Sequence, residues 1–94
     1  MTKDELATEI SRKTGIDKVV VVKTIESLME TVKLNMTNNK NIYLRGFGTF
    51  LVKKRAEKTA RNISKNTVVI IPEHFIPSFK PSKEFIDEVK TKKA

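Results

Sequence analysis

The period of the hydrophobic pattern changes once along the chain, and this change limits the possible fold more than any other feature. Before residue 39, apolar side chains recur at steps of three and four residues, which is typical of an α-helix. The series is Val21, Ile25, Leu28, Val32 and Met36. After residue 40, "NIYLRGFGTFLV" alternates apolar and more polar side chains from Ile42 to Arg45, which is typical of β-strands. Helices followed by strands predict an α+β fold.

Short end signals predict a helical hairpin at the N-terminus. Thr2 and Glu5 match the capping box that opens a helix, and Gly15 is a natural end because glycine adopts the left-handed conformation at little cost. Asp17 is the expected cap of a second helix that runs to about Asn38. The two helices share an apolar face that is too broad for one small chain to cover, and dimerisation would cover it.

The strands are expected to continue into a long ribbon. Gly46 and Gly48 allow a tight turn between the first two strands, and "TVVIIPEHFIPSF" returns as a further strand after a polar stretch. We therefore expect a three-stranded antiparallel sheet from which residues 51–76 extend as a two-stranded β-ribbon arm. The outer half of this arm is expected to have almost no apolar side chains and to be mobile without a partner.

A short helix is expected to follow the ribbon. Ser82 is its predicted N-cap, and Phe85, Ile86 and Val89 fall on its inner face. The sequence has no internal repeat and no linker, so we expect a single domain over residues 1–94. Its expected parts are a helical dimerisation part (1–40), the sheet and arm (41–79) and the C-terminal helix (82–92).

Positive charge is concentrated in the predicted arm. The formal net charge of the chain is +8. Residues 53–66 contain six Lys or Arg residues and one acidic residue, Glu57, which gives this stretch a net charge of +5. A solvated surface usually mixes its charges, so this concentration points to a polyanion. Nucleic acid is the first candidate and an anionic membrane the second.

The sequence offers little that could perform catalysis or hold a cofactor. It has one histidine, His74, and no cysteine, which excludes disulfides and cysteine-ligated metal sites and fits a reducing cytoplasm. The glycines at 46 and 48 lie between strands, whereas a phosphate-binding glycine loop precedes a helix. No stretch approaches the roughly 20 apolar residues of a membrane span, and residues 1–10 lack the apolar core of a signal peptide. We therefore expect no enzyme, no metal, no cofactor and no membrane partner.

The motif "GFGTF" at residues 46–50, followed by "RAEKTARN" at 55–62 and by a helix beginning near "PSFKPSK", resembles the HU/IHF family of bacterial histone-like DNA-bending proteins. The resemblance covers essentially the whole chain and is most specific at residues 46–62. It implies an intertwined dimer, with itself or with a paralogue, whose two arms wrap double-stranded DNA along the minor groove. It also implies a nucleoid-associated protein of the cytoplasm that condenses and organises the bacterial chromosome with low sequence specificity. Flexible, nicked or pre-bent DNA would be favoured.

The tip of the arm departs from the family pattern. The family usually has a proline after Arg-Asn that wedges between base pairs, and this sequence has Ile63 there. Lys58 and Ala60 also stand where the family often has arginine and glycine. Isoleucine is apolar and stiff at its β-branch, so Ile63 is expected to act as the wedge. The alternative is that Ile63 packs against its own arm or against a neighbouring chain.

The resemblance implies roles for sixteen residues in DNA binding. Ile63 would be the wedge, and Arg61 and Asn62 would enter the minor groove. Phosphate contacts would come from the arm, through Arg55, Lys58, Arg61 and Lys65, from the saddle between the arms, and from the flanks. Lys53 and Lys54 would lie at the base of the arm. The predicted DNA-binding residues are Lys3, Arg45, Gly46, Gly48, Lys53, Lys54, Arg55, Lys58, Arg61, Asn62, Ile63, Ser64, Lys65, Lys80, Ser82 and Lys83.

Two other classes of function compete with this interpretation. The ribbon could pair with other proteins by strand addition, but that would require more exposed apolar side chains than the arm is expected to have. The protein could also be an RNA-binding module, but such modules stack bases on exposed aromatic side chains, and the one Tyr and five Phe mostly fit core positions.

Overall fold

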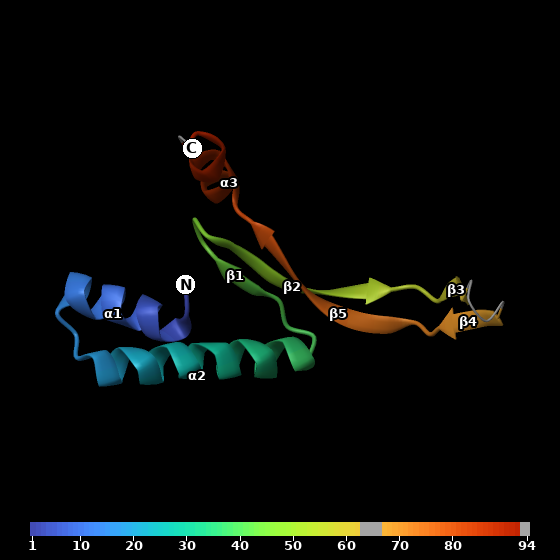
Figure 1. Cartoon of the computed structure of the whole chain (residues 1–94), viewed down its shortest axis with the longest axis horizontal. Helices are drawn as coiled ribbons and strands as arrows, with labels where there is room; N and C mark the ends of the chain where they lie inside the picture. The colour runs from blue at the N-terminus through green and yellow to red at the C-terminus, as the bar shows by residue number, and fades with distance from the viewer. Residues whose placement is uncertain (63–66, 93–94) are drawn as a thin grey trace.

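The computed structural model describes residues 1–62 and 67–92 and has the predicted α+β architecture (Figure 1). The helices are α1 (Lys3–Thr14), α2 (Lys18–Thr37) and α3 (Lys83–Lys90). The strands are β1 (Ile42–Leu44), β2 (Gly48–Arg55), β3 (Lys58–Asn62), β4 (Thr67–Ile71) and β5 (His74–Pro81). Helix α1 lies along α2, the sheet stands over α2, and the β3–β4 end of the ribbon extends away from the helices.

The helix ends agree with the signals in the sequence. The Thr2 Oγ1 atom accepts a hydrogen bond from the Glu5 backbone N–H (3.2 Å), and Gly15 ends α1 in the left-handed conformation with φ of 76°. The Asp17 carboxylate accepts a hydrogen bond from the Val19 N–H (2.9 Å) at the start of α2. Each cap satisfies a backbone group that a helix leaves without a partner, so the predicted hairpin is confirmed at both helices.

The sheet has the strand order β1-β2-β5 with antiparallel neighbours, as predicted. Phe50 is the central residue of the register, because it pairs with Ile42 of β1 and with Phe79 of β5. The turn between β1 and β2 is closed by a hydrogen bond from the Phe47 N–H to the Leu44 carbonyl (3.0 Å), with Gly46 at φ of 81°. That positive φ explains the glycine, because other residues adopt it only with strain.

The ribbon consists of two ladders with a joint between them. The β2–β5 ladder ends at the pair Arg55 and His74, and the β3–β4 ladder begins at the pair Lys58 and Ile71. Two residues on each strand, Ala56–Glu57 and Pro72–Glu73, fall between the ladders. Proline has no backbone N–H to donate, so Pro72 accounts for the interruption on its strand.

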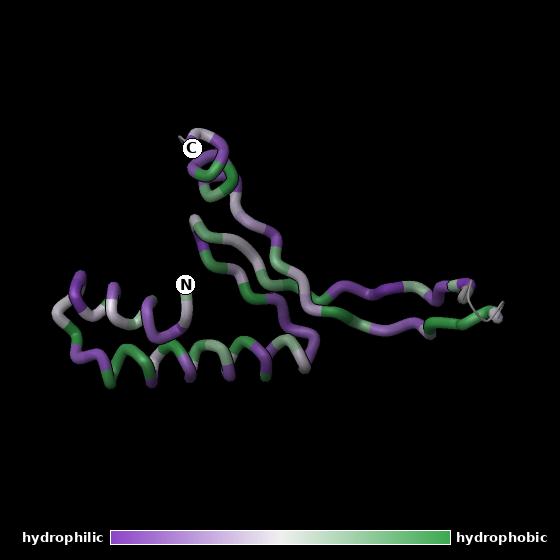
Figure 2. The backbone as a smooth tube through the Cα atoms, in the orientation of Figure 1, coloured by the Kyte–Doolittle hydropathy of each residue, from purple (hydrophilic) through white to green (hydrophobic). Residues whose placement is uncertain are grey.

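The outer ladder corrects one expectation, because it is not poor in apolar side chains. Val68, Val69, Ile70 and Ile71 form most of β4, and their exposed fractions are 64%, 46%, 62% and 38%. The register places this run opposite the basic strand β3 and not within the inner sheet. Figure 2 shows the contrast, with one strand of the ribbon end hydrophilic and the other hydrophobic.

The interior of the single chain is small. Four phenylalanines, at positions 47, 50, 79 and 85, pack with ring centroids 4.9–6.4 Å apart. Ala7 and Val21 are the buried hydrophobic residues of the part that the structure describes. Large apolar side chains of α2 stay exposed, among them Leu28 at 52% and Leu34 at 64%. The broad apolar face that the sequence predicts is therefore present and uncovered in one chain.

Candidate nucleic-acid interface

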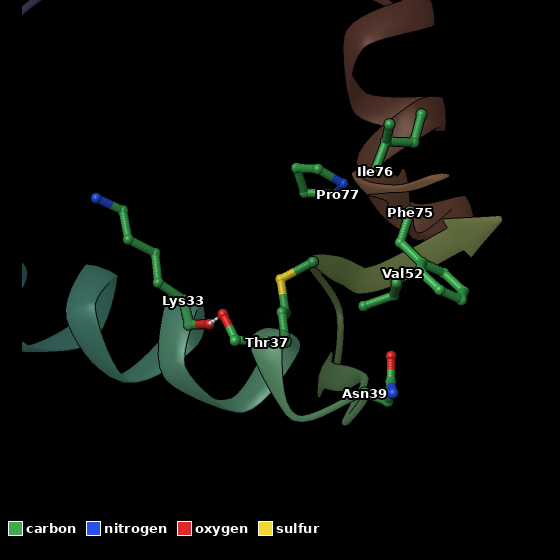
Figure 3. A pocket seen from close by; sticks show the side chains of 8 residues that line it. Lys33, Thr37, Asn39, Val52, Phe75, Ile76 and Pro77 are labelled. Carbon is green, nitrogen blue, oxygen red and sulfur yellow. Dashed lines mark hydrogen bonds between the residues drawn. The ribbon is translucent and has the colours of Figure 1, made fainter. Parts of the chain in front are cut away.

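The register of the sheet separates its side chains into an apolar face and a basic face. Side chains alternate between faces along a strand, and cross-strand partners share a face. Phe50 and Val52 of β2 therefore lie on one face with their partners Phe79 and Pro77 of β5. Val52 and Pro77, together with Met36 of α2, line a cavity of about 400 Å³ between helix and sheet (Figure 3). This is the apolar face, and it faces α2.

The opposite face holds Thr49, Lys53 and Arg55 of β2 and Lys80 of β5, the partner of Thr49. It also holds the apolar residues Leu51 and Ile76, and we call it the basic face because of its three positive charges. The side chains of Lys53, Arg55 and Lys80 are all exposed. Because these three charges lie on the same face of two neighbouring strands, they make that face positive. The structure thus brings together three of the predicted DNA-binding residues.

Tyr43 lies on the basic face and was missing from the predicted site. It pairs with Thr49 across β1 and β2, and 74% of its surface is exposed. The signal was present in the alternation of Ile42, Tyr43 and Leu44, which turns the tyrosine away from its apolar neighbours. An exposed aromatic ring on the same face as Lys80 can stack on a base or sugar, or donate a hydrogen bond from its hydroxyl.

The two lysines at the base of the arm, Lys53 and Lys54, point to opposite faces of the sheet. Lys54 lies on the apolar face beside its cross-strand partner Phe75, and its Nζ atom is 3.0 Å from the Glu73 Oε1 atom. Lys53 points to the opposite, basic face. The charge of Lys54 is therefore partly compensated by Glu73, and Lys53 is better placed to meet a phosphate.

The outer ribbon presents positive charge on both of its faces. Lys58 and Arg61 of β3 are three residues apart, so their side chains point to opposite faces of the β3–β4 ladder. A ribbon with charge on both faces can reach the two backbones that border a groove. Asn62 ends β3. Ile63, Ser64 and Lys65 lie outside the described residues.

The two predicted glycines have structural reasons for their identity. Gly46 holds the positive φ of the β1–β2 turn. Gly48 is buried, and a Cβ atom there would lie 2.6 Å from the Lys80 carbonyl oxygen and 2.7 Å from the Phe79 ring. Arg45 lies in the same turn and is exposed, so its side chain can reach a ligand.

Three of the predicted flanking residues lie at the starts of helices, whereas Lys80, expected at the start of the last helix, lies in strand β5. The Lys3 Nζ atom is 3.1 Å from the Glu26 Oε2 atom, which ties the start of α1 to the middle of α2. The Ser82 Oγ atom caps α3 by accepting a hydrogen bond from the Phe85 N–H (3.2 Å), and the Ser82 N–H donates to the Phe47 carbonyl (2.9 Å). Lys83 is the first residue of α3 and is exposed.

Neither a metal site nor a membrane-spanning helix is found in the part of the chain that the structure describes. Within residues 1–62 and 67–92, no group of three or more His, Cys, Asp or Glu side chains is placed to hold a metal ion. No helix among these residues is both long and apolar enough to cross a membrane. His74 lies at the joint of the ribbon, where its Nδ1 atom is 2.9 Å from the Pro72 carbonyl oxygen.

A sheet with an exposed basic face, continued by a protruding ribbon with charge on both sides, defines a β-ribbon DNA-binding protein. The comparisons with known proteins agree. A family model described as bacterial DNA-binding protein matches residues 1–90. The chain belongs to this family, which includes HU and integration host factor (IHF) and consists of architectural DNA-binding proteins, not enzymes.

The relatives match over nearly their whole length. The SPbeta prophage-derived DNA-binding protein HU 2 of Bacillus subtilis is 33% identical over 98% of this chain and 100% of its own. The integration host factor subunit beta of Marinobacter nauticus is 36% identical over 95% of this chain and 92% of its own. An Anabaena HU–DNA cocrystal structure has a TM-score of 0.91 at 26% identity and covers 98% of this chain and 100% of that one. An HU mutant from Thermotoga maritima has a TM-score of 0.72 at 27% identity, with 95% of this chain and 99% of that one covered.

Proposed function

We propose that the protein acts as an intertwined dimer that bends and wraps double-stranded DNA, each chain placing its ribbon along the minor groove. One observation carries this proposal: the ribbon leaves the helices with basic side chains on both of its faces. Wrapping would organise the bacterial chromosome with low sequence specificity, in the cytoplasm and on the nucleoid. The proposed contacts come from the sixteen residues named from the sequence, and Lys54 contributes least because it pairs with Glu73.

The exposed apolar surface of the helices supports the dimer. Val20 and Leu28 of α2 are each 52% exposed, and Leu34 and Val19 more so. A monomer rarely leaves so many large apolar side chains in water, because burying each one contributes about 1.5–3 kcal/mol. A second copy, or a close paralogue with the same pattern, would cover them. Light scattering at micromolar concentration should therefore give a mass of at least two chains.

We propose that Ile63 is the wedge that opens a base step. Unstacking a step costs about a few kcal/mol, and burying an isoleucine side chain offsets roughly 1.5–3 kcal/mol of this. Phosphate contacts that form only on bent DNA would supply the rest. Those contacts would come from residues such as Lys53, Arg55 and Lys80 on the basic face.

End-to-end FRET on a ~35-bp duplex tests bending, since that length leaves room for both flanks to wrap around a two-kink bend. At saturating protein, the wild type should bring the ends together. Ile63→Ala should bind but bend much less, and Ile63→Val, which keeps an apolar β-branched side chain, should keep most of the bend. Equal bending by wild type and Ile63→Ala would remove the wedge from the proposal and leave bending to charge and shape.

The phosphate contacts have a separate signature in salt. If the complex neutralises Z phosphates, the logarithm of the affinity should fall with the logarithm of salt concentration at a slope of about −0.9Z. A nearly flat response would contradict wrapping. Competition between duplex DNA and single-stranded RNA distinguishes the proposal from an RNA-binding module, which should prefer the RNA.

A further inference from the structure

Strand β4 has the composition of an interior strand but lies at an edge. The β3–β4 sheet has two strands, so among the described residues β4 has a hydrogen-bonded neighbour on one side only. Its four aliphatic residues point to both faces of the ladder, with Val69 and Ile71 on one and Val68 and Ile70 on the other. Strands that are apolar on both faces are usually buried within a sheet. Each of these four side chains is at least 38% exposed here.

The two edges of the ribbon differ in charge. Strand β3 carries Lys58 and Arg61, and charged side chains on an edge strand oppose pairing with another chain. Strand β4 has no charged residue between Thr67 and Ile71. Among the described residues, the outer edge of β4 has no neighbouring strand, and β4 has no charged side chain that would oppose pairing there.

We propose that β4 pairs with β4 of a second copy when the protein is free of DNA, which joins two ribbons into one four-stranded antiparallel sheet. With Val69 at the two-fold axis, Val68 of each copy faces Ile70 of the other, so aliphatic side chains meet on both faces. The basic β3 strands become the outer strands, separated by three strand spacings, or about 14 Å. At physiological salt the screening length is about 8 Å, so the two positive strands repel each other little.

DNA and this pairing exclude each other. The minor groove is about 6 Å wide before any deformation, and a four-stranded sheet is about twice as wide as the ribbon that would enter it. Binding of DNA along the ribbon therefore separates the paired copies. This competition rests on the proposed function, whereas the self-association in the absence of DNA does not.

Sedimentation velocity and light scattering without DNA test the pairing. The wild type should show masses above that of the dimer, rising with concentration. Ile70→Lys should abolish the rise, and Ile70→Thr, which keeps the β-branch, should reduce it. Thr59→Lys is the matched control, because Thr59 is the cross-strand partner of Ile70 and places the same charge on β3. It should retain most of the association.

Cysteine cross-linking tests the register, since the natural chain has no cysteine. Val69→Cys should form a disulfide between copies at least tenfold faster than Thr59→Cys, and saturating duplex DNA should suppress it. A wild type that never exceeds the dimer mass would overturn the proposal, as would an Ile70→Lys variant that associates like the wild type. If Ile70→Lys changes only the affinity for DNA, β4 faces the DNA and the proposal also fails. DNA binding and bending by the wild type, measured separately, decide the proposed function whichever result is found.

Discussion

Phe79 lies directly against Gly48, so closely that a Cβ atom on this glycine would be 2.7 Å from the Phe79 ring. The same Cβ atom would be 2.6 Å from the backbone oxygen of Lys80, which cannot move without disturbing the β2–β5 ladder. Gly48 therefore sets the distance at which the second and last strands of the sheet pack around the aromatic cluster.

Gly48→Ala should lower the free energy of unfolding by about 1–3 kcal/mol, because an added methyl group forces the backbone or the Phe79 ring to shift. Denaturant unfolding at a fixed protein concentration measures this decrease. Thr49→Ala is the neighbouring control. Thr49 is half-buried on the basic face, so its replacement should cost less. Equal stability of Gly48→Ala and the wild type would show that the Phe79 ring and the Lys80 backbone can move away from residue 48 at no cost in free energy.

The helices were predictable from the sequence because their signals are local. Thr2, Gly15 and Asp17 act within a few residues of the backbone groups that they cap. The sheet was predictable in order but not in register. Pairing Phe50 with Phe79 depends on residues 29 positions apart, and no local pattern specifies such a pair.

The candidate site was predicted as a cluster of charge, but its faces were not resolved. Simple alternation could have separated Lys53 from Lys54 and placed Tyr43 with the basic residues. The exposed apolar strand β4 was missed for a different reason. Its exposure depends on the register between the two strands of the ribbon. That register determines whether the aliphatic run pairs with the inner sheet or with β3.

Lys53→Ala should weaken DNA binding more than Lys54→Ala, although both remove one positive charge. Lys53 lies on the basic face, whereas Lys54 lies on the apolar face and pairs with Glu73. The salt dependence gives the clearer measurement. The slope of log affinity against log salt should become shallower by about 0.9 for each phosphate that Lys53→Ala no longer neutralises, and should change little in Lys54→Ala. Similar slopes in both variants would contradict the assignment of the faces.

Glu26→Gln should strengthen DNA binding with little effect on folding. The Lys3–Glu26 pair is nearly half exposed on both sides, with side-chain values of 44% and 47%, so breaking it should change the free energy of unfolding by less than about 1 kcal/mol. Lys3 would then be available to a phosphate. Titration of the variant with labelled duplex at moderate salt measures the increase in affinity.

Glu9→Gln is the matched control for this experiment, because it removes the same charge from an exposed position on α1. If both variants bind more tightly by the same factor, the effect comes from the overall charge of the protein and not from the release of Lys3. Lys3→Ala should abolish the increase when it is combined with Glu26→Gln.

Ser82 combines a capping role with a proposed phosphate contact, and two substitutions separate them. Ser82→Ala removes the hydrogen bond to the Phe85 N–H and should lower the free energy of unfolding by about 0.5–2 kcal/mol. Ser82→Asp keeps a capping oxygen and places a negative charge at a helix N-terminus, where the helix dipole favours it. Its stability should therefore stay close to that of the wild type. If DNA phosphates approach this end of α3, the aspartate repels them, and the affinity should fall at low salt and recover relative to the wild type as salt screens the repulsion. An affinity of Ser82→Asp equal to that of the wild type at low salt would restrict Ser82 to capping and leave Lys80 and Lys83 to hold the flanking DNA.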